Sequence, residues 1–170
     1  ALSAAGVAIA LALQGSLSNI ASGLLILFFH PFKVGDYVEA ENNSGTVSEI
    51  QLMFTCLNTP DNRRVIIPNS LMTSGSVVNY TGEEKRRLEL TFGVGYSDDI
   101  AQVKEVLGRV IRENPLCILE PEPIVAVNAH LDSCVQMIIK VWVETKDYWT
   151  LYYEIMEQVK LAFDQEGISI

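Results

Sequence analysis

No Asp, Glu, Lys or Arg occurs in the first 32 residues, so all 33 charged residues of this 170-residue chain lie after Phe32. A chain of this length can form one ordinary domain or two small ones. Residues 88–170 carry 14 acidic and six basic residues, whereas residues 33–87 carry seven and six. A chain this acidic gains nothing from the release of phosphate counterions, which argues against a nucleic-acid partner, and none is expected. An acidic surface instead attracts cations or keeps a domain soluble.

Cysteine is also scarce. Cys56, Cys117 and Cys134 are odd in number and widely spaced, so they form neither a disulfide framework nor a set of metal ligands. We expect buried free thiols in a reducing compartment.

Groups typical of enzymes are nearly absent. The two histidines, His30 and His130, have no Cys or Ser arranged as in a catalytic triad. The Gly-Val-Gly of residues 93–95 lacks the third glycine of a dinucleotide-binding loop. Asp98 and Asp99 fit a helix cap better than a pair of catalytic carboxylates. The sequence therefore predicts no enzyme, no metal and no cofactor.

The uncharged segment 1–29 could be a signal peptide, a buried core helix or a membrane helix. A signal peptide has a basic start and a shorter apolar core, and a soluble core helix rarely runs this long without a charge. Membrane insertion explains the segment best. We expect a transmembrane helix over residues 1–29.

The first half of this segment is rich in small residues at three- and four-residue spacing. Such rows let helix backbones approach closely, and two rows suit a ring in which each helix contacts both neighbours, although a simple helix pair would also use them. The rows contain Ser3, Ala4, Gly6, Ala8, Ala10 and Ala12.

Val7 and Leu11 are four residues apart and therefore share one helix face. Repeated around a ring, they would form two apolar constrictions that block ions by dewetting. Contact with lipid is the alternative interpretation of both side chains.

A polar stretch, residues 14–19, interrupts the segment at its middle. A straight 29-residue helix would be roughly 43 Å long, whereas the hydrocarbon core is about 30 Å thick. A bend at Gly15 would remove the excess and lay the second half near the membrane interface. The stretch that ends in His30 and Pro31 predicts the helix end.

The remainder predicts two small domains. Residues 30–82 contain five short strand-like runs separated by turn signals, including 60–62, which is typical of an SH3- or Sm-like barrel. Residues 83–87 are charged and are expected to form a solvated connector. Residues 83–170 then follow the order strand, helix, two strands, helix and the start of a strand, which is typical of a ferredoxin-like α/β sandwich.

Two stretches carry a specific resemblance. The first is Ala-Leu-Ala-Leu-Gln-Gly-Ser-Leu-Ser-Asn at residues 10–19, followed by Gly23 and by Phe-His-Pro-Phe-Lys-Val-Gly-Asp-Tyr-Val at residues 29–38. The second comprises 45–47, 65–69 and 93–96. With these motifs the chain resembles the MscS family of small-conductance mechanosensitive channels over essentially its whole length.

The resemblance implies a homoheptamer in the bacterial inner membrane, multi-pass in the full-length protein, with the residues after about 30 in the cytoplasm as a hollow cage. Its pore would open under membrane tension and release ions and small osmolytes in hypo-osmotic shock. Tension-sensing helices would precede Ala1.

The resemblance also implies roles for single residues. Val7 and Leu11 would form the seal, Gly15 the hinge, and Leu13 and Leu17 would contact the sensor helices. Asn19 would contact the turn at Asn69 and Ser70. The chain departs from the family pattern at four positions: Val7 replaces leucine, Ser3 and Ala10 replace glycine, and His30 replaces arginine.

Two further functions are compatible with parts of the sequence. A soluble regulatory module on one membrane anchor would be monomeric in detergent, and an Sm-like protein would bind RNA at low salt. Neither explains the rows of small residues or the break at Gly15.

Overall fold

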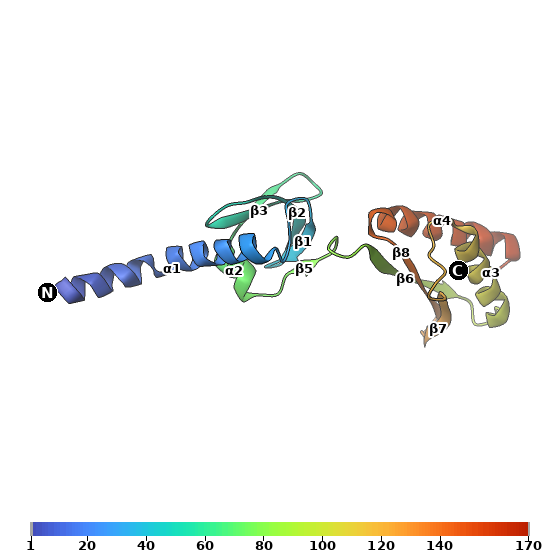
Figure 1. Cartoon of the computed structure of the whole chain (residues 1–170). Helices are drawn as coiled ribbons and strands as arrows, with labels where there is room; N and C mark the ends of the chain where they lie inside the picture. Colours follow the sequence, from blue (N-terminus) through green and yellow to red (C-terminus); the bar gives the residue numbers. More distant parts are fainter. Residues whose placement is uncertain (1, 170) are drawn as a thin grey trace. The chain divides into compact units, whose positions relative to one another are not determined.

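The computed structural model describes the backbone of residues 2–169 and the side chains of residues 4–169. It divides into two compact units, Ala1–Gly82 and Glu83–Ile170, each with its own hydrophobic core. Figure 1 shows the elements of each unit.

The first unit contains a long helix, α1 (Leu2–Phe29), and a five-stranded antiparallel sheet with a short second helix. The strands lie in the order β4-β3-β2-β1-β5. The elements after α1 are β1 (Tyr37–Ala40), β2 (Asn43–Ile50), β3 (Phe54–Asn58), β4 (Arg64–Pro68), α2 (Asn69–Ser74) and β5 (Val78–Asn79).

Turn chemistry sets the register of this sheet. Ala40 pairs with Asn43, so the β1–β2 loop is only Glu41 and Asn42, and both have positive φ, as a type I′ hairpin requires. Asn62 closes the predicted β3–β4 hairpin with a φ of 64°. Four strands joined by short turns and a fifth that follows α2 form a small β domain, as expected.

The second unit is a three-stranded antiparallel sheet with two helices over one face. The sheet order is β6-β8-β7, so the last strand in sequence lies at the centre. Alternate residues of this strand are buried against both helices. The elements are β6 (Lys85–Val94), α3 (Ile100–Glu113), β7 (Ile124–His130), β8 (Val135–Glu144), a 3-10 turn (Thr145–Asp147) and α4 (Tyr148–Glu166).

Both helices of this unit have the predicted ends. The Asp99 carboxylate accepts a hydrogen bond from the Ala101 N–H at 2.8 Å and caps α3. Gly167 ends α4 in the left-handed conformation, with φ of 70°. Ile168 is buried, and the Ser169 N–H donates to Asp98. Residues 2–169 contain three strands of this sheet. The strand predicted to begin at Ile168 is not formed at Ile168 and Ser169, and Ile170 lies outside the described residues.

Two expectations are corrected. The connector 83–87 is shorter than predicted, because β6 already begins at Lys85, which pairs with Glu144. Charged residues are tolerated at the start of β6 because neighbouring and cross-strand carboxylates form ion pairs with them. Glu89, for example, pairs with Arg87 at 2.6 Å. Helix α2 was missed, since its six residues are too short to show a helical period.

The cysteines are free thiols. Cys56 and Cys117 are buried, whereas Cys134 is half-buried. Burial, together with the negative charge of Glu154, raises the pKa of Cys117 to about 11. Burial likewise raises the pKa of Cys56.

This burial predicts an order of chemical labelling. Only the thiolate reacts with iodoacetamide, so a thiol with a raised pKa reacts slowly at pH 8. We expect Cys134 to be alkylated first and Cys117 at least tenfold more slowly, as read by peptide mass spectrometry. Labelling in urea should abolish the difference. Equal rates in the folded protein would contradict the burial described here.

Candidate functional site

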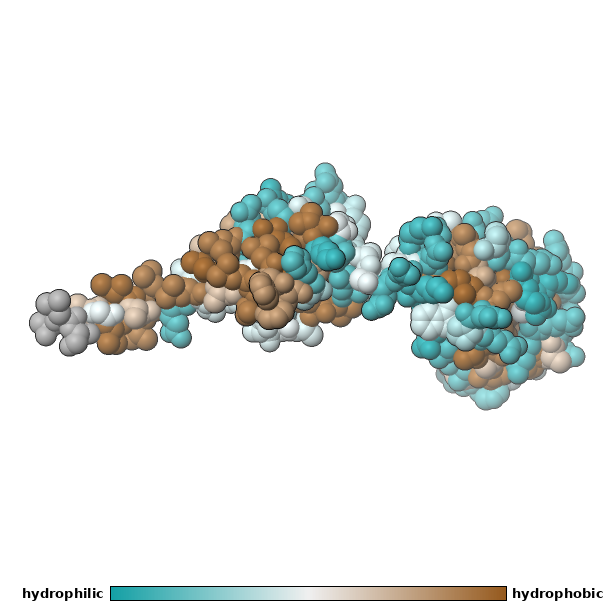
Figure 2. Space-filling model, viewed as in Figure 1, coloured by the Kyte–Doolittle hydropathy of each residue, from teal (hydrophilic) through white to brown (hydrophobic). Residues whose placement is uncertain are grey.

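Helix α1 is long, uncharged and mostly not covered by the rest of the chain. It has no charged residue, and the stretch from Ala4 to Phe29 is long and apolar enough to cross a membrane. Only 17% of its most apolar stretch is buried within the chain. This exposure argues against the core helix of a soluble domain, which would be largely buried. Figure 2 shows apolar side chains along the helix.

The described side chains in the N-terminal half of α1 are exposed. Every residue from 4 to 18 is exposed, with Val7 at 59% and Leu11 at 66%. The two apolar side chains lie one turn apart on the same face. Leu13 and Leu17, the predicted contacts to sensor helices, are also exposed and four residues apart.

The small residues in this half leave open space. A Cβ added to Gly6 would meet no atom within 4 Å apart from the backbone of its own helix. The same half carries the other predicted packing positions, Ala4, Ala8, Ala10 and Ala12, all exposed. The side chain of Ser3 lies outside the described residues. The single chain therefore offers no partner for the rows of small residues.

At Gly15 the helix is continuous. Helical structure runs unbroken from Leu2 to Phe29 in the single chain. The Asn19 side-chain amide donates to the Gly15 carbonyl at 3.1 Å, which gives this polar side chain a partner within the helix. A bend at Gly15 in an assembled channel remains a prediction.

The C-terminal half of α1 docks on the β domain along one face. Asn19, Ser22, Gly23 and Ile26 follow the i, i+3, i+4, i+7 spacing of a single helix face. Asn19 is half-buried, and the other three are buried. Ile26, 1% exposed, joins the core of the first unit.

Asn19 joins α1 to α2. Its side-chain oxygen accepts a hydrogen bond from the Ser70 N–H at 2.9 Å. The residue that precedes α2 is Pro68, which offers no side-chain acceptor for the free N–H groups at the start of that helix. Asn19 therefore supplies from α1 the acceptor that an N-cap side chain would normally provide.

One turn further along, a second contact joins the same helices. The Ser22 and Thr73 hydroxyls lie 2.7 Å apart. Since Ser22 is three residues after Asn19 and Thr73 three after Ser70, the two contacts lie on successive turns of helices that run side by side.

Gly23 packs closely against the loop between β2 and β3 and against the start of α2. A Cβ at this position would lie 2.1 Å from the Leu52 carbonyl oxygen and 2.6 Å from the Asn69 side-chain nitrogen. Neither atom can move easily. Asn69 is fully buried, donates to the Gln51 and Leu52 carbonyls and accepts from the Thr55 hydroxyl. Asn69 thus fixes the surface on which Gly23 rests.

This packing predicts opposite effects at two glycines of one helix. Gly23→Ala should weaken the packing of α1 on the β domain and lower the melting temperature of the purified protein. Such a clash reduces the free energy of unfolding by about 1–3 kcal/mol. Gly15→Ala is the matched control, because a Cβ there meets nothing within 4 Å and alanine favours the helix by about 1 kcal/mol. Equal melting temperatures for wild type and Gly23→Ala would contradict the close contact.

Known proteins share these features. Residues 15–82 match the family described as "Mechanosensitive ion channel, beta-domain", and residues 88–170 match "Mechanosensitive ion channel MscS, C-terminal". The crystal structure of Helicobacter pylori MscS in its closed state superposes with a TM-score of 0.94 at 30% identity, over 99% of this chain and 67% of that one. The chain belongs to the MscS family.

Curated relatives agree with this membership. A small-conductance mechanosensitive channel of Edwardsiella ictaluri is 39% identical over 98% of the chain and 58% of the relative. An MscS family protein of Synechocystis is 40% identical over 99% of the chain and 57% of the relative. The chain therefore spans less than two thirds of the length of these relatives. MscS family membership supports a channel subunit located in a membrane.

The MscS-type resemblance recognised from the sequence is confirmed. The contacts between α1 and the β domain were only partly predicted. The Asn19 contact with the 68–70 turn was expected, whereas Ser22 and Ile26 were given no role. The spacing of these residues along one helix face could have indicated them. Their use in docking was hidden because the partner, α2, was not recognised as a helix.

The second unit of this MscS-family chain holds no group of three or more His, Cys, Asp or Glu residues, among those described, that could bind a metal. His130 stacks on Tyr96, whose hydroxyl donates to the Leu131 carbonyl at 2.6 Å. Asp98 accepts from the Gly95 and Ser169 N–H groups. These polar residues stabilise loops and strand ends.

Proposed function

We propose that this chain forms the pore-lining and cytoplasmic part of one subunit of a homoheptameric channel. Membrane tension opens the channel, which then releases ions and small osmolytes in hypo-osmotic shock. The channel lies in the bacterial cytoplasmic membrane, with residues after about 30 on the cytoplasmic side. One observation carries the proposal: half of an uncharged 28-residue helix is exposed on every side, while its other half is docked on a soluble domain.

A ring of α1 helices accounts for this exposure. The small residues at positions 3, 4, 6, 8, 10 and 12 let neighbouring helices approach, and close packing is the main attraction between helices in lipid. Leu13 and Leu17 then contact the tension-sensing helices. Val7 and Leu11 face the axis and close the pore by excluding water.

Gly15 is the proposed hinge between the ring and the docked half. Gly15→Ala raises helix preference by about 1 kcal/mol per subunit, so a bent non-conducting state is disfavoured in every subunit. We expect slower loss of current under sustained tension, with conductance unchanged. A non-conducting channel with a straight α1 in every subunit would contradict the hinge.

The mass of the full-length protein in detergent tests the assembly. We expect native mass spectrometry to give seven subunits. A monomer would contradict the proposal and would favour a regulatory module on a single membrane anchor, because a ring cannot then form. Gly6→Leu is a useful variant, since a large side chain should separate neighbouring helices and reduce the heptamer, whereas Ala129→Leu in the second unit should not.

A further inference from the structure

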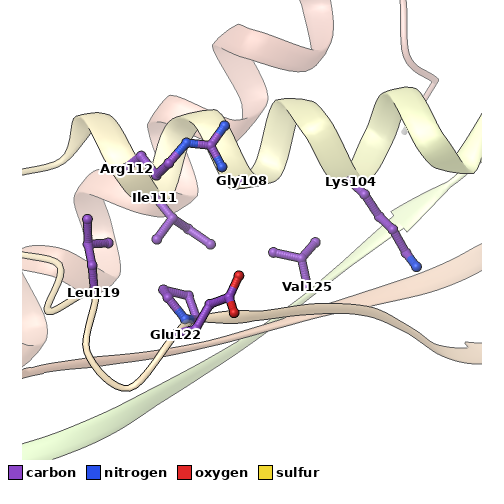
Figure 3. A pocket seen from close by; sticks show the side chains of 8 residues that line it. Lys104, Gly108, Ile111, Arg112, Leu119, Glu122 and Val125 are labelled. Atoms are coloured by element: carbon purple, nitrogen blue, oxygen red, sulfur yellow. The ribbon is translucent and has the colours of Figure 1, made fainter.

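The second unit contains a hollow that the proposed channel function does not use. Its volume is about 360 Å³, within the range of pockets that bind small molecules. It lies between α3 and the segment that leads into β7 (Figure 3). Its lining comprises Lys104, Gly108, Ile111, Arg112, Leu119, Glu122, Pro123 and Val125.

The two cations of this hollow stand apart from the other basic residues of the acidic region 88–170. That region has six basic and 14 acidic residues. Four of the six basic residues form an ion pair with a carboxylate: Arg109 with Glu166, Lys140 with Glu89, Lys146 with Glu144 and Lys160 with Asp164. Lys104 and Arg112 are the two that have no carboxylate oxygen within 4 Å among the described residues, and both line the hollow.

A glycine makes room for one of these cations. Gly108 lies inside α3, where glycine costs about 1 kcal/mol relative to alanine. A Cβ at this position would lie 3.0 Å from a guanidinium nitrogen of Arg112. Figure 3 shows Arg112 turned back over Gly108 and Lys104 turned away from it. Because Gly108 has no side chain, the Arg112 guanidinium can lie over this face of the helix.

The rest of the hollow is apolar except for one carboxylate. Its apolar lining includes Ile111 of α3, which is buried, and Pro123 and Val125 on the facing segment, which are half-buried. Glu122 lies opposite the helix, and its carboxylate is turned toward α3 in Figure 3. The charges lining the hollow are therefore two positive and one negative.

We propose that this hollow binds a small acidic amino acid, with its two carboxylates on Arg112 and Lys104 and its ammonium facing Glu122. The charges complement one another, because such a ligand carries two negative groups and one positive group. Lys104 and Arg112 are eight residues apart on one helix, so their Cα atoms lie about 12 Å apart along the helix axis. Both side chains are long and flexible, and each can donate a charge-assisted hydrogen bond to one carboxylate of a short dicarboxylate bound between them.

Calorimetric titration of the full-length protein in detergent with L-glutamate tests the site. We expect saturable millimolar or tighter binding, weaker binding of glutarate, which lacks the ammonium, and none of inorganic phosphate. Arg112→Gln and Lys104→Gln should each weaken glutamate binding about tenfold, since each loses a hydrogen bond to a charged group. Lys146→Gln, an equal charge change outside the hollow, should bind as wild type does.

Glu122→Gln separates an amino acid site from a general anion site. This variant should bind glutamate more weakly and glutarate no more weakly than wild type. All three variants change exposed side chains, so their melting temperatures should stay near that of wild type. No saturable glutamate binding, equal binding of phosphate, tighter binding of glutarate by wild type, or an equal loss in Lys146→Gln would each overturn the proposal.

Discussion

Leu11→Ser in the full-length protein is expected to give a channel that opens at clearly lower tension or leaks at rest. Leu11 and Val7 are the large apolar side chains on the proposed pore face, and Leu11 is 66% exposed in the single chain. A ring of leucines excludes water from a narrow pore, whereas seven hydroxyls there would hydrate it. Cells that express this variant should grow slowly, and membrane patches should show channel openings at reduced suction.

The matched control for this variant is Leu17→Ser. Leu17 is also an exposed leucine of α1, but it is assigned to contacts with the sensor helices and not to the seal. We expect its substitution to raise the tension needed for opening and to cause no leak. An unchanged threshold and no leak in Leu11→Ser would remove Leu11 from the gate.

Asn19→Ala is expected to slow the loss of current under sustained tension at least about fivefold. The substitution removes the acceptor for the Ser70 N–H and leaves the start of α2 without a cap. A hydrogen bond contributes about 1 kcal/mol net, which corresponds to about a fivefold change for each subunit. We propose that α1 is docked in this way in the non-conducting states, so that loss of this contact slows entry into them.

Pressure steps held for many seconds would measure this effect. Single-channel conductance should stay at the wild-type value, because Asn19 lies far along α1 from Val7 and Leu11. Asn43→Ala is the control, since that side chain donates to the Glu41 carbonyl within its own hairpin. If the current of Asn19→Ala decays at the wild-type rate, the contact between Asn19 and α2 does not control inactivation.

The sequence predicted the elements whose patterns are local. The alternating Leu88 and Leu90 indicated a strand, Asp99 a cap and Gly167 a helix end, and each depends only on near neighbours. The uncharged segment likewise predicted its helix, because an apolar run of this length without a charge is typical of a membrane-spanning helix.

Long-range packing accounts for the features that the sequence could not predict. Helix α2 has six residues and is held by Asn69, whose partners lie 14 to 18 residues earlier in the chain. Gly23 is recognisable as a docking position only once the Leu52 carbonyl is placed beneath it. The hollow beside Gly108 depends on a loop that packs across α3.

Recording from membrane patches that contain the full-length protein, in cells without other mechanosensitive channels, tests the central claim most directly. Suction should open discrete currents whose probability rises steeply with tension and falls when the suction is released. Patches from control cells should stay silent over the same range. Expressed protein that is present in the membrane yet gives no tension-dependent current up to rupture of the patch would contradict the account.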